Sequence, residues 1–230
     1  MKNIAIIPAR GGSKRIPKKN IRSFYGFPVI MYSIEAALNS GCFSEVMVST
    51  DDDEIAEVAR RFGARVPFKR SALNSNDQAS TADVLLEVIS QYKDAGKVWD
   101  FFCCLYPAAP LITPQKIKKG YQLMIESGAD SLIPVVKFSY PIQRALSVEK
   151  GRLFRVEPKY SESRSQDLPA RYHDAGQFYW AKTSSFLTEK QLLMKNTVPM
   201  EVLETEVQDI DNEMDWQIAE LKYQLMMRNK

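Results

Sequence analysis

The sequence has few of the residues that build metal clusters or disulfide scaffolds. It contains one histidine and three cysteines, and no two cysteines have the CxxC spacing of a zinc ligand pair. Cys103 and Cys104 are adjacent within an apolar run, which is typical of reduced core residues. The composition therefore argues against a zinc site and against a fold held by disulfides.

Long hydrophobic runs and an excess of one charge are also missing. The longest mostly apolar stretch, residues 101–112, is broken by two prolines, whereas a membrane helix needs roughly 20 apolar residues. The 31 basic and 28 acidic side chains leave a net charge of +3, too little to suggest a nucleic-acid or membrane-surface partner. Residues 1–10 lack the apolar core of a signal peptide, so we expect a cytoplasmic location.

The chain does have an ordinary globular composition over 230 residues, with 45% hydrophobic and 26% charged side chains. Apolar runs that end at turn residues alternate with stretches of helical periodicity. The expected strands are 3–8, 45–50, 65–69, 101–106, 130–138 and 177–181. The expected helices are 28–40, 51–62, 84–92, 113–127 and one from about residue 212 onward. This order predicts an α/β fold with a mostly parallel sheet covered by helices on both faces.

The periodicity also predicts which helix faces are buried. The apolar stripe of the first helix consists of Ile30, Ile34, Ala37 and Leu38. The stripe of the last helix consists of Met214, Ile218, Leu221 and Leu225. Asp51, with Glu54 three residues later, predicts a capping-box-like start for the second helix.

The alternation of strands and helices stops after residue 138. Residues 145–156 are typical of a β-hairpin that turns at 149–151, and the polar residues 157–172 have no clear period. We interpret residues 139–175 as an insertion or lid within a single domain that spans 1–230.

The loop after the first strand is where an open α/β sheet binds ligands. Residues 8–20 read PARGGSKRIPKKN, with two glycines and five cations, Arg10, Lys14, Arg15, Lys18 and Lys19. Glycines let the backbone approach a ligand, and N–H groups together with cations can hold a polyphosphate. A Walker A loop and a GxGxxG fingerprint are absent, which argues against an ATPase and a dehydrogenase. The alternative interpretation is a solvated basic loop.

A second candidate site precedes the last helix. In an extended segment, Asp209 and Asp211 point to the same side and offer hard oxygens to one Mg²⁺. The alternative is that both are helix-capping or loop aspartates. A polyphosphate loop together with a carboxylate metal site is what nucleotidyl transfer needs.

Five arginines in the irregular part of the chain have the planar guanidinium groups that bind a carboxylate. They are Arg144, Arg152, Arg155, Arg164 and Arg171. The alternative for most of them is a surface or interface position. His173 is isolated, which is more typical of a structural residue than of a catalytic base.

Four segments together resemble the CMP-sugar synthetases, also called acylneuraminate cytidylyltransferases. They are IIPARGGSKRIPKKN (6–20), VSTDDDEIA (48–56), PAAPL (107–111) and QDIDNEMDW (208–216). The likeness covers nearly the whole chain. It implies a Rossmann-like nucleotide-diphospho-sugar transferase fold, a homodimer and Mg²⁺ dependence. It also implies transfer of CMP from CTP to the anomeric hydroxyl of a 2-keto sugar acid, with release of pyrophosphate.

The resemblance also implies roles for individual positions. The expected nucleotide-binding residues are Ala9, Arg10, Gly11, Ser13, Lys14, Lys19, Asn20, Arg70, Thr81 and Tyr106. The expected sugar-binding residues are Gln143, Arg144, Arg164, Arg171 and Tyr179. Asp209 and Asp211 match the metal aspartates, and the catalytic candidates are Lys19, Arg10 and Asp211, with Lys19 at the place of the family's essential lysine.

The departures from the sialic acid members concern the sugar. Tyr106 stands where those members have the glutamine of QPTSPL, and residues 139–146 and 165–180 look more like the pseudaminic acid cytidylyltransferases. The expected product is CMP-pseudaminic acid, and the alternatives are the same reaction on N-acetylneuraminic or legionaminic acid. A non-catalytic nucleotide-binding protein is the alternative from another class. A nucleic-acid binder is disfavoured because the basic residues gather in one loop.

Overall fold

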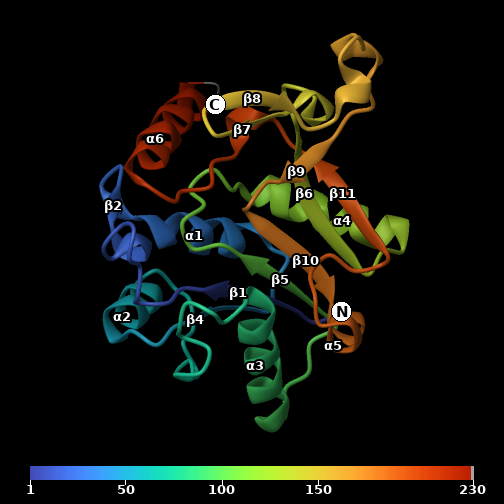
Figure 1. The fold of residues 1–230 in the computed structure, drawn as a ribbon. Coiled ribbons are helices and arrows are strands. Elements are labelled where there is room, and N and C mark those ends of the chain that lie inside the picture. The colour runs from blue at the N-terminus through green and yellow to red at the C-terminus, as the bar shows by residue number, and fades with distance from the viewer. Residues whose placement is uncertain (229–230) are drawn as a thin grey trace.

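The computed structural model describes residues 1–228 around a seven-stranded sheet in the order β11-β6-β10-β5-β1-β4, in which β9 also pairs with β6 (Figure 1). The strands are β1 (Asn3–Pro8), β4 (Glu45–Ser49), β5 (Phe101–Leu105), β6 (Ser131–Lys137), β9 (Tyr172–Asp174), β10 (Phe178–Lys182) and β11 (Thr197–Glu201). The sequence predicted all of these except β9 and β11.

The strand directions determine where the site can lie. β1 runs parallel to β4 and β5, β11 runs parallel to β6, and β10 is antiparallel to both β5 and β6. Five strands therefore point the same way, which confirms the mostly parallel sheet, while β9 and β10 run against them. The carboxyl ends of β1, β4, β5 and β6 share one edge of the sheet, where an open α/β sheet binds its ligands.

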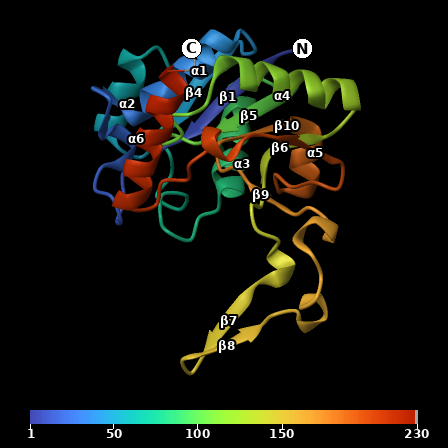
Figure 2. The same cartoon turned by 90° about the horizontal axis from the view of Figure 1, so that it is seen from above.

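Helices cover both faces of the sheet, as predicted (Figures 1 and 2). Ala5 and Ile7 of β1 lie in the core cluster with α1, α2 and α4, whereas Ile4 and Ile6 lie in the cluster with α3 and α5. This alternation is the period of a strand buried on both sides. The helices are α1 (Val29–Ser40), α2 (Asp53–Arg61), α3 (Thr81–Asp94), α4 (Pro114–Ser127), α5 (Thr183–Glu189) and α6 (Glu213–Arg228).

The helix boundaries follow local chemistry. Gly41 ends α1 with φ 66° and Gly128 ends α4 with φ 65°, a left-handed conformation that glycine adopts without steric cost. Ser80 accepts the N–H of Asp83 and forms a capping box that starts α3, and Thr113 caps α4. The stops after α1 and α4 confirm the sequence prediction.

Two local predictions are wrong. Residues 65–69 make isolated bridges to residues 47 and 50 rather than a strand, because Pro67 has no N–H with which to continue a ladder. Leu38 is 44% exposed; it lies at the margin of the buried face of α1, where its Cδ1 would be 3.2 Å from a Cβ on Gly63.

The cap of α2 also differs from the prediction. Asp52, not Asp51, is the capping residue, and its Oδ1 accepts the N–H of Ile55 at 3.0 Å. Asp51 instead accepts the N–H of Gly11 from the loop after β1, at 3.0 Å. The neighbouring carboxylates therefore have separate tasks, one in the helix and one in the loop.

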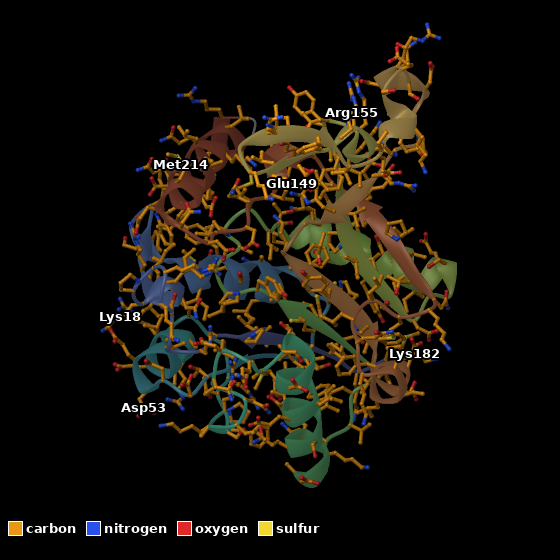
Figure 3. The ribbon with its side chains drawn as sticks, in the orientation of Figure 1. Lys18, Asp53, Glu149, Arg155, Lys182 and Met214 are labelled. Atoms are coloured by element: carbon orange, nitrogen blue, oxygen red, sulfur yellow. The ribbon has the colours of Figure 1, made fainter. Side chains whose placement is uncertain are left out.

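The buried face of α6 is not the one that the sequence predicted. Of the expected stripe, Met214, Leu221 and Leu225 are 61%, 64% and 44% exposed, and Ile218 is half-buried; Figure 3 labels Met214 on this helix. The buried residues are Trp216 and Ala219. Trp216 packs edge-on against a ring of the short β2–β3 ribbon (Ser23–Phe24 and Phe27–Pro28), and burial of its large ring decides the orientation of the helix.

The insertion between β6 and β10 contains the predicted hairpin, β7 (Leu146–Glu149) and β8 (Arg152–Arg155). Lys150 and Gly151 form its turn with positive φ angles of 49° and 75°, as a two-residue hairpin turn requires. The hairpin projects away from the sheet (Figure 2). Within residues 1–228, every helix is too short or too polar to cross a membrane.

Candidate functional site

The loop between β1 and α1 is fixed to the structure at both ends. Ala9, buried directly after β1, donates its N–H to the carbonyl of Ser49 at the end of β4 (2.9 Å). The buried Asn20 closes the loop, because its Nδ2 donates to the carbonyl of Arg10 (2.9 Å). Ser13 donates its N–H to the carbonyl of Gly11 (2.9 Å), which tightens the turn between these ends.

Gly11 allows this loop to lie against the start of α2. A Cβ on Gly11 would lie 2.6 Å from Oδ2 and 2.9 Å from Cβ of Asp52, the capping residue of that helix. A Cβ on the neighbouring Gly12 would have nothing within 4 Å. Lys18 adds an ion pair to Glu54 at 2.5 Å; Figure 3 labels Lys18 and Asp53 on this side of the molecule.

A cavity of about 410 Å³ opens beside the loop. Its charged lining consists of Arg10, Lys14, Arg15, Lys19, Asp77 and Asp211. Arg10 pairs with Asp77 at 2.7 Å, and Lys14 pairs with the same carboxylate. Arg15 pairs with Asp211 at 2.7 Å. Four cations against two carboxylates leave a positive cavity, which suits a polyphosphate.

Lys19 links the loop to the late carboxylate segment. Its Nζ donates to the carbonyl of Ile210 at 2.7 Å. Burial lowers the pKa of Lys19, and the carboxylates of Asp211 and Asp209 oppose that shift. The ammonium group thus lines the cavity and interacts with both aspartates.

Asp209 and Asp211 lie on the side of their segment that faces away from the core, because Ile210 between them is buried. Burial and the neighbouring Asp211 raise the pKa of Asp209, although part of its side chain is exposed to solvent; of the two aspartates, Asp211 lines the cavity. Two carboxylates that repel each other favour a cation between them, so the pair fits Mg²⁺ with phosphate and water as further ligands. The described residues hold no cluster of three or more His, Cys, Asp or Glu that could bind a metal without such ligands.

Helix α6 holds this segment in place. Asp215 Oδ2 accepts the N–H of Asp211 at 2.9 Å. Lys222 Nζ donates to the carbonyl of Val207 at 2.7 Å, at the other end of the segment. The aspartates are therefore positioned by groups of the last helix as well as by Lys19.

A smaller cavity of about 150 Å³ shares Pro8 and Arg10 with the first, and Arg70, Thr81 and Tyr106 line it. Arg70 is buried, and its Nη2 donates to the carbonyl of Ser49 at 2.6 Å. Burial lowers its pKa, which nearby carboxylates partly oppose. The structure thus brings these three predicted nucleotide residues together beside the larger cavity.

The predicted sugar residues are more scattered. A cavity of about 290 Å³ in the insertion places Arg171 in one lining with Lys137, a residue that sequence reasoning missed. Gln143 is buried and donates Nε2 to the carbonyl of Pro169 (2.8 Å), so it supports this cavity. Arg144 donates to Ser165 Oγ at 3.0 Å, at the edge of the same segment.

Two other predicted sugar residues have partners within the protein. Arg164 pairs with Asp167 at 2.9 Å, and its side chain is 75% exposed. Tyr179 is 4% exposed, and its hydroxyl donates to the carboxylate of Asp174 at 3.0 Å. The exposed group at this point is therefore Asp174, which sequence reasoning also missed.

Asp77 is the most informative of the missed residues. It lies in the polar segment between Arg70 and Thr81, which has no periodicity that would indicate its direction. The only sequence signal for Asp77 was its position between Arg70 and Thr81, two candidate nucleotide-binding residues. The contact of Asp51 with the loop was not predicted, because the sequence analysis assigned this residue to the start of a helix.

Known proteins resemble this chain over nearly its whole length. A family model described as cytidylyltransferase matches residues 4–220. The chain is 42% identical to the pseudaminic acid cytidylyltransferase of Campylobacter jejuni serotype O:2, over 98% of this chain and 97% of that protein. It is 36% identical to N-acylneuraminate cytidylyltransferase A of Danio rerio, over 94% of this chain and 49% of that protein.

The fold is shared with a solved CMP:2-keto-3-deoxy-manno-octonic acid synthetase complexed with CTP. The TM-score is 0.72, with 21% identity and all of both chains covered. This likeness shows the Rossmann-like nucleotidyltransferase fold that the motifs implied. With the family match over nearly the whole length, the chain therefore belongs to the cytidylyltransferase family.

Proposed function

We propose that this chain transfers CMP from CTP to the anomeric 2-hydroxyl of pseudaminic acid, giving CMP-pseudaminic acid and pyrophosphate. The observation that carries the proposal is the hydrogen bond from Lys19 to Ile210, which joins a cationic cavity to the pair Asp209 and Asp211. The choice of sugar rests on the 42% identity to the Campylobacter jejuni relative.

The two adjoining cavities divide the nucleotide between them. The triphosphate takes the larger one, with Arg10, Lys14 and Lys19 as its cations, and the base takes the smaller one, beside Arg70 and Tyr106. Arg10 lines both and is positioned to bind a phosphate next to the nucleoside. Fixed cations at this place stabilise the negative charge that develops as the pyrophosphate leaves.

The proposed metal ligands are Asp209 and Asp211, whose paired carboxylates fit Mg²⁺. When bound, Mg²⁺ would offset the negative charge of the phosphates during transfer. Lys19 holds the backbone between the two aspartates, and Asp215 holds that of Asp211, so the pair is oriented before any ligand arrives.

The reaction needs no covalent enzyme intermediate. The sugar hydroxyl oxygen attacks the α-phosphorus in line, the bond from that phosphorus to the pyrophosphate oxygen breaks with its electron pair going to the departing pyrophosphate, and the hydroxyl proton passes to solvent water. Arg171 and Lys137 are proposed to bind the sugar carboxylate as a charge pair, with Gln143 and Arg144 supporting their segment. Tyr179 contributes through Asp174.

A homodimer is part of the proposal. The hairpin exposes four large apolar side chains, Leu146, Val148, Leu153 and Phe154, and it projects from the domain (Figure 2). An isolated two-stranded hairpin is marginally stable in water, so a second copy of the chain is the expected cover. We also propose a cytoplasmic location, since the three cysteines are free thiols and fit a reducing compartment.

The test of the function is pyrophosphate release from CTP and Mg²⁺ with pseudaminic acid, N-acetylneuraminic acid and legionaminic acid in parallel. We expect selective turnover of pseudaminic acid. Preference for another of the three would keep the reaction and refute the sugar. No turnover with any of them, although CTP binds, would favour a non-catalytic nucleotide-binding protein.

A further inference from the structure

The carboxylate of Asp77 forms ion pairs with two of the four cations that line the large cavity. Its Oδ1 accepts from Arg10 at 2.7 Å, and its other oxygen accepts from Lys14. Asp77 belongs to the cavity lining, so these contacts lie where an incoming phosphate would need the same N–H groups. Any anion that binds Arg10 and Lys14 together must first displace this carboxylate.

The environment of Asp77 differs from that of the metal pair. Lys14 and then Arg10 hold the pKa of Asp77 below its usual value, whereas burial and a second carboxylate raise the pKa of Asp209. A carboxylate surrounded by cations is already neutralised and has little need of a metal. Asp77 thus mimics an anionic ligand.

The loop that carries Asp77 is ordered by its own hydrogen bonds. Oδ1 of Asn76 accepts the N–H groups of Gln78 at 2.7 Å and Ala79 at 3.0 Å. Glu87 on α3 accepts the N–H of Ser71 at 2.8 Å, at the start of the loop. The carboxylate is therefore presented to the cavity from a defined backbone, and it can return to the cations once a ligand has left.

We propose that Asp77 is an internal competitor of pyrophosphate for Arg10 and Lys14, and that it sets how tightly the cavity retains this leaving group. The inference rests on the proposed function, in which this cavity holds the phosphates of CTP. Any phosphate ligand must displace Asp77 at the same cost in free energy. Pyrophosphate lacks the base and ribose contacts of CTP, so this cost is a larger share of the binding free energy of pyrophosphate than of CTP. Because product release limits many enzymes, such competition favours turnover.

The test is calorimetric titration of inorganic pyrophosphate into the full chain at constant ionic strength. We expect Asp77→Asn to bind pyrophosphate about three- to tenfold more tightly than the wild type, the gain from removing two exposed ion pairs. The matched control is Asp94→Asn, an exposed acid at the end of α3, which should leave the dissociation constant unchanged. Pyrophosphate should also become a stronger inhibitor against CTP in the Asp77 variant.

Unchanged or weaker binding by Asp77→Asn would overturn the inference. Lys14→Met separates this failure from failure of the proposed function. If Lys14→Met weakens pyrophosphate binding and Asp77→Asn does not tighten it, the cavity holds phosphate and Asp77 is no competitor. If Lys14→Met leaves pyrophosphate binding unchanged, the cavity does not hold phosphate, and both this assignment and the proposed role of Asp77 are refuted.

Discussion

Lys19 Nζ lies 2.7 Å from the carbonyl oxygen of Ile210, although 191 positions separate the two residues in the chain. The first loop and the last segment before α6 therefore form one site, with the cations of the large cavity on one side and carboxylates on the other. This bond can exist because β1 lies inside the sheet and α6 packs against the ribbon that follows the loop.

Replacement of Lys19 tests that connection. Lys19→Ala should lower the rate of pyrophosphate release by roughly 10² or more, the loss typical of removing a transition-state donor. It also leaves the carbonyl of Ile210 without its partner. Lys119→Ala, at an exposed position of α4, is the control and should be active. Near-normal activity of Lys19→Ala would refute its assignment.

The metal assignment predicts a different pattern for Asp211. Asp211→Ala should abolish Mg²⁺-dependent turnover while the protein stays folded, because one of two carboxylate ligands is lost. Binding of Mn²⁺, followed by electron paramagnetic resonance, should weaken in parallel, and circular dichroism should stay unchanged. Wild-type Mn²⁺ binding by the variant would exclude Asp211 as a ligand.

Two adjacent glycines give a matched pair for the loop. Gly11→Ala should destabilise the fold by about 1–3 kcal/mol, since its Cβ would lie 2.6 Å from the carboxylate that caps α2. Gly12→Ala meets open space and should change stability little. Urea unfolding of both variants measures the difference, and equal stabilities would contradict the close packing of the loop on α2.

The insertion cavity separates two arginine candidates for the sugar. Arg171→Gln should raise the KM for the sugar about tenfold or more and leave the KM for CTP unchanged, because it removes one charge of the proposed carboxylate site. Arg164→Gln loses only an exposed ion pair and should change neither value. Steady-state kinetics with each substrate varied in turn measures both KM values. A larger rise in the KM for the sugar in Arg164→Gln than in Arg171→Gln would reverse the assignment.

The exposed apolar side chains of the hairpin predict which surface holds the proposed dimer together. Val148 and Leu153 face each other across β7 and β8, and both are exposed. Val148→Asp combined with Leu153→Asp should convert a dimer into monomers at micromolar concentration, measured by sedimentation. Val98→Asp, another exposed apolar residue, should leave the association unchanged. Wild-type protein that sediments as a monomer would refute the dimer itself.

Most of the fold could be predicted because hydrophobic period and turn residues are local signals. β1, β4, β5, β6 and β10 each appear as a short apolar run, and glycine follows both α1 and α4. β9 and β11 were missed because β9 is three exposed residues and β11 has one buried residue. Their pairing with β6 is decided by the sheet and leaves no apolar pattern in the sequence.

The face of α6 shows the limit of periodicity. Met214, Leu221 and Leu225 form a helical stripe, yet Trp216 and Ala219 are buried. A stripe identifies an apolar face but not the surface that covers it. The ribbon next to α6 provides an aromatic cluster against which Trp216 packs, and Met214, Leu221 and Leu225 stay exposed.

The α/β order, the cationic loop with its glycines, and the late pair Asp209 and Asp211 could be predicted from the sequence, because each depends on residue patterns that are local in the chain. The partners of these groups depend on the tertiary fold: Lys19 Nζ donates to the carbonyl of Ile210, and the carboxylate of Asp77 forms ion pairs with Arg10 and Lys14. These contacts join segments far apart in the chain. They depend on strand order and loop path, which set where side chains meet and which local residue patterns do not encode.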